Sequence, residues 1–166
     1  MTGTDQDNQE LVISRIFNAP RSRVWRAWTD PDFVMRWWGP KVFTSPECKI
    51  DLQVGGKYIF VMRSPEGRDY YSTGRYLTIE PLNKLIFTDS FADEKGNVVP
   101  ATYYGMDGNI PLELLVTVLF EDQDGKTKMT MRHEGFPEAE IREQAKIGWS
   151  ESFDKLSESL MEPIND

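Results

Sequence analysis

Hydrophobic residues near the C-terminus recur every three or four positions, which is the spacing of one helical face. Ile141, Trp149, Phe153 and Leu160 belong to this stripe, and Pro163 ends it. The pattern predicts a helix over residues 138–161. At 1.5 Å per residue this helix would be roughly 36 Å long. A helix of this length must lie across a broad surface, and its apolar stripe predicts nearly complete burial of Trp149 and Phe153.

Alternating apolar and polar residues predict strands through the rest of the chain. Short turn-rich connections such as Gly55-Gly56 and 122–125 join successive strands, which favours an antiparallel meander. Two short helices follow the first strand, the first reaching Trp28 and the second spanning 32–38 before Gly39. The pattern therefore predicts an α+β fold, with strands over residues 11–17, 47–53, 57–63, 70–79, 84–91, 112–121 and 126–133.

The same alternation predicts which side chains face the long helix. His133 shares a strand face with Met129 and Met131, so it is predicted to point inward. The inward set is large, aromatic and rich in methionine. It can form a solid core, or it can line a gap where a curved sheet is held away from a long helix. For the Trp37-Trp38 pair, core packing and a place at a cavity mouth remain equally open. The residues predicted to line such a cavity are Trp37, Trp38, Tyr58, Phe60, Met62, Phe87, Met129, Met131, His133, Trp149 and Phe153.

Composition excludes several functions. A net charge of -8 and a pI near 4.8 argue against binding to nucleic acid or to anionic membrane surfaces, since both require a basic face. The single cysteine, Cys48, excludes an internal disulfide. One cysteine and one histidine are also too few ligands for a zinc site. No segment is apolar enough to insert into a membrane. We therefore expect a cytoplasmic protein, with a disordered polar N-terminus over 1–9 and one domain over 10–162.

No arrangement of residues predicts catalysis. His133 is the only histidine, and no Gly-x-Ser-x-Gly motif occurs. Gly55-Gly56 precedes a strand, so no helix N-terminus is available there to hold a phosphate. We predict no catalytic residue, no metal ligand and no cofactor.

Several short motifs, in order, resemble the family of heat-shock protein 90 ATPase activator homologues, of the START/polyketide-cyclase/birch-pollen-allergen (SRPBCC) superfamily. The resemblance covers about residues 11–160 and implies the helix-grip fold, in which a curved seven-stranded antiparallel sheet grips the C-terminal helix. It also implies a deep hydrophobic cavity. The motifs are Phe-Asn-Ala-Pro at 17–20, Trp-Trp-Gly-Pro at 37–40, Asp-Leu-Gln-Val-Gly-Gly at 51–56, Gly-Arg-Tyr-Leu-Thr-Ile-Glu-Pro at 74–81, Leu-Ile-Phe-Thr at 85–88 and Gly-Trp-Ser-Glu-Ser-Phe-Asp-Lys-Leu at 148–156.

The leading hypothesis is binding of a small hydrophobic or amphipathic molecule between the sheet and the C-terminal helix, with His133 as polar anchor. One alternative is a protein-interaction module with a chaperone as partner. The other is a cyclase- or hydrolase-like enzyme, for which only His133 and a tyrosine qualify as acid-base groups. The segment over 96–109 is longer than a hairpin needs. It is either a self-packed surface loop or a flap over the cavity that uses Val99, Tyr103, Tyr104 and Met106.

Overall fold

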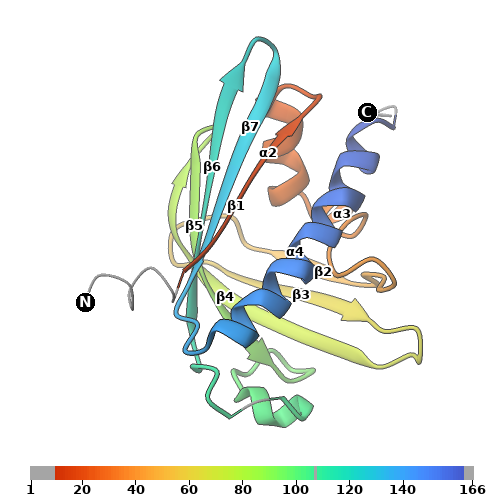
Figure 1. The fold of residues 1–166 in the computed structure, drawn as a ribbon, viewed down its shortest axis with the longest axis vertical. Coiled ribbons are helices and arrows are strands. Elements are labelled where there is room, and N and C mark those ends of the chain that lie inside the picture. The colour runs from red at the N-terminus through yellow and green to blue at the C-terminus, as the bar shows by residue number, and fades with distance from the viewer. Residues whose placement is uncertain (1–9, 107, 163–166) are drawn as a thin grey trace.

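Seven strands form one antiparallel sheet in the order β1-β7-β6-β5-β4-β3-β2 (Figure 1). The computed structural model describes residues 10–106 and 108–162, so the N-terminal segment predicted to be disordered lies outside the described residues. The sheet and the long C-terminal helix confirm the predicted α+β, helix-grip architecture. The strands are β1 (Glu10–Phe17), β2 (Cys48–Ile50), β3 (Lys57–Arg63), β4 (Asp69–Glu80), β5 (Lys84–Ala92), β6 (Leu114–Gln123) and β7 (Lys126–Glu134). The helices are α2 (Arg21–Thr29), α3 (Pro31–Val34), the short 3-10 helix η1 (Ala101–Tyr104) and α4 (Ala139–Leu160).

The two early helices begin and end where local chemistry dictates. Pro20 precedes α2, and its carbonyl accepts hydrogen bonds from the backbone N–H groups of Arg23 and Val24. The Asp30 carboxylate accepts a hydrogen bond from the Asp32 N–H at 3.0 Å and so caps α3. Pro31 occupies the first turn of α3, where its missing N–H is not needed.

Two elements are shorter than predicted. The helix expected over 32–38 ends at Val34, and Trp37 and Trp38 follow in a turn that Gly39 closes with a φ of +99°. The strand expected over 47–53 is reduced to Cys48–Ile50. After Ile50 the chain enters a tight turn, in which the backbone of Gly56 lies close to that of Asp51. A Cβ at Gly56 would lie 2.1 Å from the Asp51 carbonyl oxygen. Such close backbone approaches have no signature in apolar periodicity.

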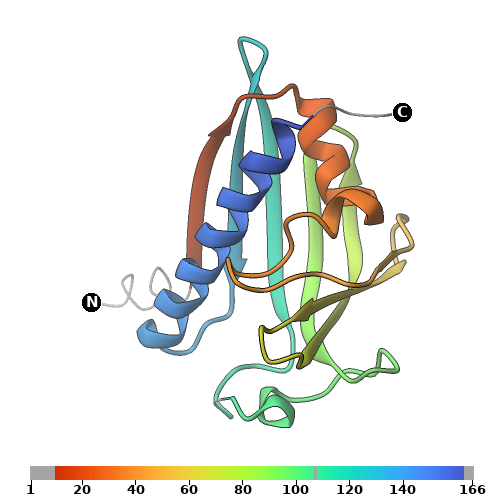
Figure 2. The same cartoon turned by 90° about the vertical axis from the view of Figure 1, so that its right-hand side faces the viewer.

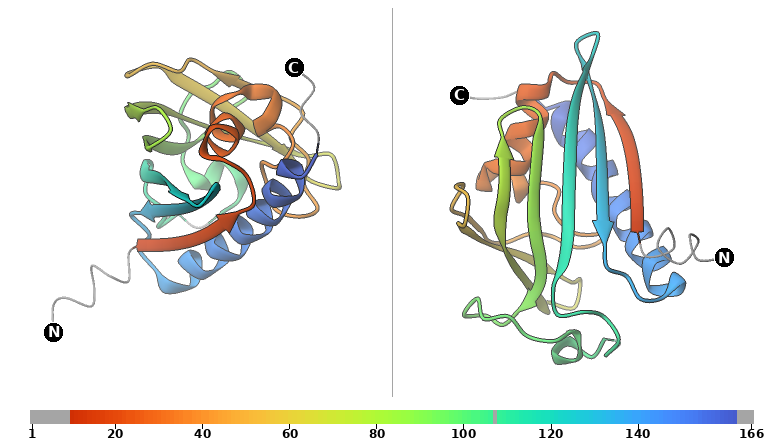
Figure 3. Two further views of the ribbon diagram at one scale, coloured as in Figure 1. Left: turned by 90° about the horizontal axis from the view of Figure 1, so that it is seen from above. Right: turned by 90° about the vertical axis from the view of Figure 1, so that its left-hand side faces the viewer.

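The sheet is curved, and its concave face holds the helices. Figure 2 shows α4 running diagonally across that face with α2 beside it, and the view from above in Figure 3 shows the strands curling around α4. In Figure 1, β3 runs at a steep angle to β6 and β7. The register of β4 against β5 shifts by one residue between Tyr76 and Thr78, which is the kind of bulge that bends a strand. None of the described helices is long and apolar enough to cross a lipid bilayer.

The second half of α4 packs into a solid aromatic core. Trp28 of α2 stands at its centre, with its ring centroid 4.8 Å from that of Trp37 and 6.2 Å from that of Phe153. The Trp28 indole N–H points at the sulfur of Met129 at 3.2 Å. Arg15 of β1 also fixes α4, since its guanidinium donates to the Ser150 carbonyl and pairs with Asp154. The first half of α4 has no such filling against the sheet.

Candidate functional site

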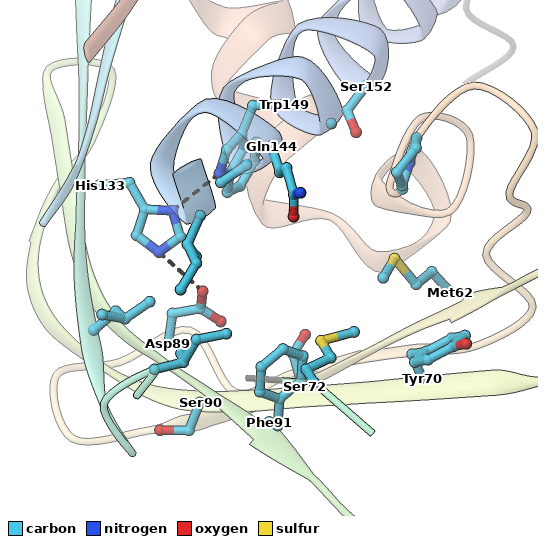
Figure 4. Close-up of a pocket in the computed structure, with 18 of the residues that line it drawn as sticks. Met62, Tyr70, Ser72, Asp89, Ser90, Phe91, His133, Gln144, Trp149 and Ser152 are labelled. Atoms are coloured by element: carbon cyan, nitrogen blue, oxygen red, sulfur yellow. Dashed lines mark hydrogen bonds and ion pairs between the residues drawn. The ribbon is translucent and has the colours of Figure 1, made fainter. Parts of the chain in front are cut away.

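A pocket of about 370 Å³ lies against the first half of α4, where that half faces β3, β4 and β5 (Figure 4). Its walls are mostly apolar and aromatic, and they come from four parts of the chain. The α4 wall includes Ile141, Ala145, Gly148, Trp149 and Ser152; the sheet wall includes Met62, Tyr70, Ser72, Asp89, Phe91 and His133; the loop after α3 gives Trp38, Gly39 and Pro40; and the segment that leads into β6 gives Met106, Ile110, Pro111 and the first strand residue, Leu114.

Small residues on α4 leave space between this part of the helix and the sheet. Ala145 and Gly148 lie on the face that lines the pocket, together with Trp149. A Cβ built at Gly148 would meet only the Pro40 ring, at 3.7 Å. Space therefore remains here, whereas Phe153 and Leu156, farther along α4, are fully buried in the core.

The loop at the edge of the pocket is fixed to α4 by Lys155. Its ammonium group donates hydrogen bonds to the carbonyl oxygens of Gly39 at 2.9 Å, Pro40 at 3.0 Å and Phe43 at 2.9 Å. The Glu151 carboxylate accepts a further hydrogen bond from the Lys41 N–H at 3.1 Å. Burial lowers the pKa of Lys155, and the nearby Glu151 charge opposes that shift. These contacts make the pocket rim a fixed part of the fold.

A polar corner interrupts the apolar wall. The Trp149 indole N–H donates to His133 Nδ1 at 3.0 Å, and His133 Nε2 lies 3.2 Å from Asp89 Oδ2 (Figure 4). An indole nitrogen can only donate, so Nδ1 must be the unprotonated nitrogen and the neutral ring carries its hydrogen on Nε2. The Nε2 contact with Asp89 lacks hydrogen-bond alignment, although it falls within ion-pair distance. His133 is only 5% exposed, so its Nε2 is a buried polar group without a well-aligned partner among the described residues.

Asp89 is the site residue that sequence reasoning missed. In β5, Leu85 and Phe87 face the core, and Asp89 and Phe91 continue the same face into the pocket. Asp89 pairs with Leu114 of β6, and His133 pairs with Val116 two residues along, so the two polar residues approach each other across β6. The sequence carried the signal, since a carboxylate at an inward position of an apolar strand face requires a partner or a ligand.

The arrangement suits binding better than acid-base catalysis by histidine. His133 Nδ1 accepts from Trp149, and its Nε2 is buried and lies 3.2 Å from Asp89, so both ring nitrogens face protein groups. Cys48 lies outside the pocket, and burial, the largest cause, raises the pKa of its thiol to about 12. A thiol held protonated in this way is a poor nucleophile. Within residues 10–106 and 108–162, no group of acidic, histidine or cysteine side chains could hold a metal ion.

The structure separates the predicted cavity residues into two groups. Trp38, Met62, His133 and Trp149 line the pocket. Tyr58 and Met131, at 1% and 0% exposure, belong to the packed core. The other core members of the predicted set are Trp37, Phe60, Phe87, Met129 and Phe153. Contact of any of these residues with a ligand remains a prediction.

The burial of Trp149 differs from expectation. Phe153 is fully buried as predicted, but Trp149 is only partly buried because it lines the pocket. The apolar stripe of α4 predicts the same burial for Trp149 and Phe153. Their neighbours distinguish them, since Phe153 packs against the buried Trp37, whereas Trp149 packs against Trp38 at the pocket.

The segment predicted as a flap is held down at two points. The Val99 N–H donates to the Phe91 carbonyl at 2.9 Å, and the buried Tyr104 hydroxyl donates to the Ala92 carbonyl and accepts from the Tyr71 N–H. Met106 lines the pocket, whereas Tyr103 is exposed. A flap function for Val99, Tyr103, Tyr104 and Met106 therefore stays a prediction.

Comparisons with known proteins agree with this architecture. A protein from Arthrobacter aurescens solved by NMR is 28% identical, with 97% of this chain and 91% of that chain covered and a TM-score of 0.77. A protein from Chromobacterium violaceum is 25% identical, with 93% and 99% covered and a TM-score of 0.75. The AHSA1 protein from Silicibacter pomeroyi, at 22% identity, 91% and 96% coverage and a TM-score of 0.72, shares the fold.

The family assignment rests on a match along most of the chain. No significant match is found among curated protein sequences. The family model described as "Activator of Hsp90 ATPase homolog 1-like protein" matches residues 18–161, from the end of β1 through α4. This span includes every described residue of the pocket. The chain therefore belongs to the family of activator of Hsp90 ATPase homolog 1-like proteins.

Proposed function

We propose that the protein binds a small hydrophobic or amphipathic molecule in the pocket beside the first half of α4. The observation that carries this proposal is a pocket of about 370 Å³ with aromatic and aliphatic walls and one polar corner. Sites for small molecules are typically about 300–1,000 Å³, largely apolar, and supplied with a few polar groups that fix orientation. The family, whose fold is of the SRPBCC type, supports a general ligand-binding or activator module.

Rigid surroundings favour binding in this pocket. Lys155 and Glu151 hold the rim loop, and Arg15 holds α4 against β1. A site that is already formed before binding spends less of its interaction energy on ordering side chains and loops. The apolar surface of a ligand would replace water against Trp38 and Trp149, which stabilises the complex in proportion to the area buried.

The binding test uses N-phenyl-1-naphthylamine, an uncharged probe whose fluorescence rises in apolar surroundings. Titration into the purified protein should give saturable binding at one site. Ala145→Phe places a ring into the pocket and should weaken probe binding about tenfold or more, which corresponds to about 1.4 kcal/mol. The matched control is Ile147→Phe, at an exposed position on α4, which should leave the affinity unchanged.

Two results would reject the proposal. The first is the absence of saturable probe binding to the wild-type protein. The second is equal probe affinity in Ala145→Phe and Ile147→Phe, which would place the apolar site outside this pocket. Circular dichroism of both variants establishes that each is folded before its affinity is compared.

The family description supports a second candidate, a partner of an Hsp90-type chaperone ATPase. This candidate is tested by adding the protein to a purified Hsp90 ATPase and measuring the rate of ATP hydrolysis. Stimulation that is equal for the wild-type protein and Ala145→Phe would indicate an activator whose contact surface does not involve the pocket. No stimulation at saturating protein would reject this candidate.

A further inference from the structure

A single charged side chain stands in the lining of the pocket. Among the described residues that line it, Asp89 is the only one with an aspartate, glutamate, lysine or arginine side chain. Its side chain is 23% exposed. Figure 4 shows its carboxylate directed into the same space as the side chains of His133 and Gln144. Asp89 is therefore available to a molecule that occupies the pocket.

The Asp89 charge has no counter-charge among the residues that the structure describes. Within residues 10–106 and 108–162, no lysine or arginine forms an ion pair with it. His133 does not supply a positive charge, because its Nδ1 accepts the Trp149 N–H and the ring is neutral. The Tyr58 hydroxyl is near enough for the Asp89 charge to add to the larger effect of burial in raising its pKa. That hydroxyl nevertheless gives its hydrogen to the Thr88 carbonyl at 2.7 Å.

The remaining walls suit a cation as well. The rings of Trp38, Tyr70 and Trp149 line the pocket, and aromatic faces attract positively charged groups within about 6 Å of the ring. The net charge of -8 further raises the local concentration of cations relative to anions. An apolar ligand that covered Asp89 would remove water from an unpaired carboxylate, which is costly. A ligand with an ammonium group would instead neutralise it.

We propose that the ligand of this pocket is a cationic amphiphile, with a protonated amine that donates hydrogen bonds to the Asp89 carboxylate and an apolar part that lies along Trp149 and the small residues of α4. This inference rests on the proposed function and specifies its ligand class. Asp89 Oδ2 lies 3.2 Å from His133 Nε2, which leaves Oδ1 to accept from the ligand. Anionic amphiphiles such as fatty acids are excluded by repulsion.

The test compares three probes with the same ten-carbon chain: decylamine, which is protonated at neutral pH, 1-decanol and decanoate. Each is titrated as a competitor of bound N-phenyl-1-naphthylamine. We expect decylamine to bind about tenfold or more tightly than 1-decanol, and decanoate to bind most weakly. Asp89→Asn should remove the advantage of decylamine over 1-decanol. The matched control is Glu143→Gln, which removes one exposed charge from α4 and should preserve the order of the three competitors.

The outcomes separate this inference from the proposed function. If the neutral probe binds but decylamine has no advantage over 1-decanol, the cation inference is wrong and the apolar pocket stands. Tighter binding of 1-decanol would likewise reject the amine in favour of a hydroxyl. An advantage of decylamine that persists in Asp89→Asn would show that another group recognises it. If Asp89→Asn does not fold, Asp89→Ser replaces it.

Discussion

The rim of the pocket depends on one ammonium group. Lys155 Nζ donates to three backbone carbonyl oxygens, those of Gly39, Pro40 and Phe43, at 2.9–3.0 Å. Lys155→Met retains an unbranched side chain of similar length and removes all three hydrogen bonds. The carbonyl oxygens of the loop then lose their shared donor, and of the hydrogen bonds described between α4 and residues 39–43 the one from the Lys41 N–H to Glu151 remains.

The magnitude follows from the number and type of these bonds. A hydrogen bond to a charged group stabilises a fold by about 1.5–3 kcal/mol. The three bonds share one ammonium group, and part of their energy already offsets the burial that lowers the pKa of Lys155. Together the three hydrogen bonds therefore stabilise the fold by much less than three independent bonds would. We expect Lys155→Met to reduce the free energy of unfolding by about 2–3 kcal/mol.

The assay is urea denaturation at neutral pH, followed by tryptophan fluorescence. Lys146→Met is the matched control, because Lys146 is exposed on the same helix and forms no ion pair with a described residue. The control should change stability by less than about 0.5 kcal/mol. Lys155→Met should also weaken binding of N-phenyl-1-naphthylamine, since Gly39 and Pro40 line the pocket. Equal stability of the two variants would refute a stabilising role for these three hydrogen bonds.

Two further predictions concern the polar corner and high pH. His133→Gln should lower the free energy of unfolding by only about 1 kcal/mol, because glutamine can still accept from the Trp149 N–H. His133→Leu leaves that donor unpaired and should lower it by about 2–4 kcal/mol. Urea denaturation compares the two variants, and equal losses of stability would contradict this role of His133. Cys48 has a pKa of about 12 in the folded state against 9.0 for a free thiol, so its contribution to stability is complete below pH 9 and declines by about 1.4 kcal/mol per pH unit up to pH 12. The buried hydroxyls of Tyr58 and Tyr76, whose pKa values are raised by burial, add to this decline above pH 10. Urea midpoints between about pH 8 and pH 11 measure the decline, which Cys48→Ala should reduce near pH 9–10, and a Cys48→Ala profile identical to that of the wild type would contradict the assignment.

The periodicity of the sequence predicted the strands and the long helix, because each of these signals is local, and the helix-grip architecture was implied by the family resemblance. The alternation of Met129, Met131 and His133 correctly placed all three inside, and the apolar stripe correctly predicted α4. The ends of α3 and β2 were not predictable in the same way, since they depend on the turn at Gly39, which has a positive φ, and on the close backbone approach at Gly56.

The position of the pocket could not be read from the sequence. Both halves of α4 carry the same apolar stripe, but their neighbours come from distant parts of the sequence: Trp37 packs against Phe153, and Trp38 packs against Trp149 at the pocket. Which inward residues line a cavity is thus a property of the packing between elements. Asp89 is different, because its inward position follows from the alternation of Leu85, Phe87 and Phe91. A charge at that position could have identified the polar corner.

The five tryptophans test most directly whether a ligand occupies the pocket. Each indole N–H gives its own signal in a two-dimensional proton–nitrogen NMR spectrum. Trp38 and Trp149 line the pocket, Trp28 and Trp37 are buried in the core, and Trp25 packs against Phe120. We predict that saturation with N-phenyl-1-naphthylamine produces its largest indole shifts at Trp38 and Trp149 and leaves Trp25 and Trp37 nearly unchanged. Unchanged Trp38 and Trp149 signals at saturation would contradict binding at this site.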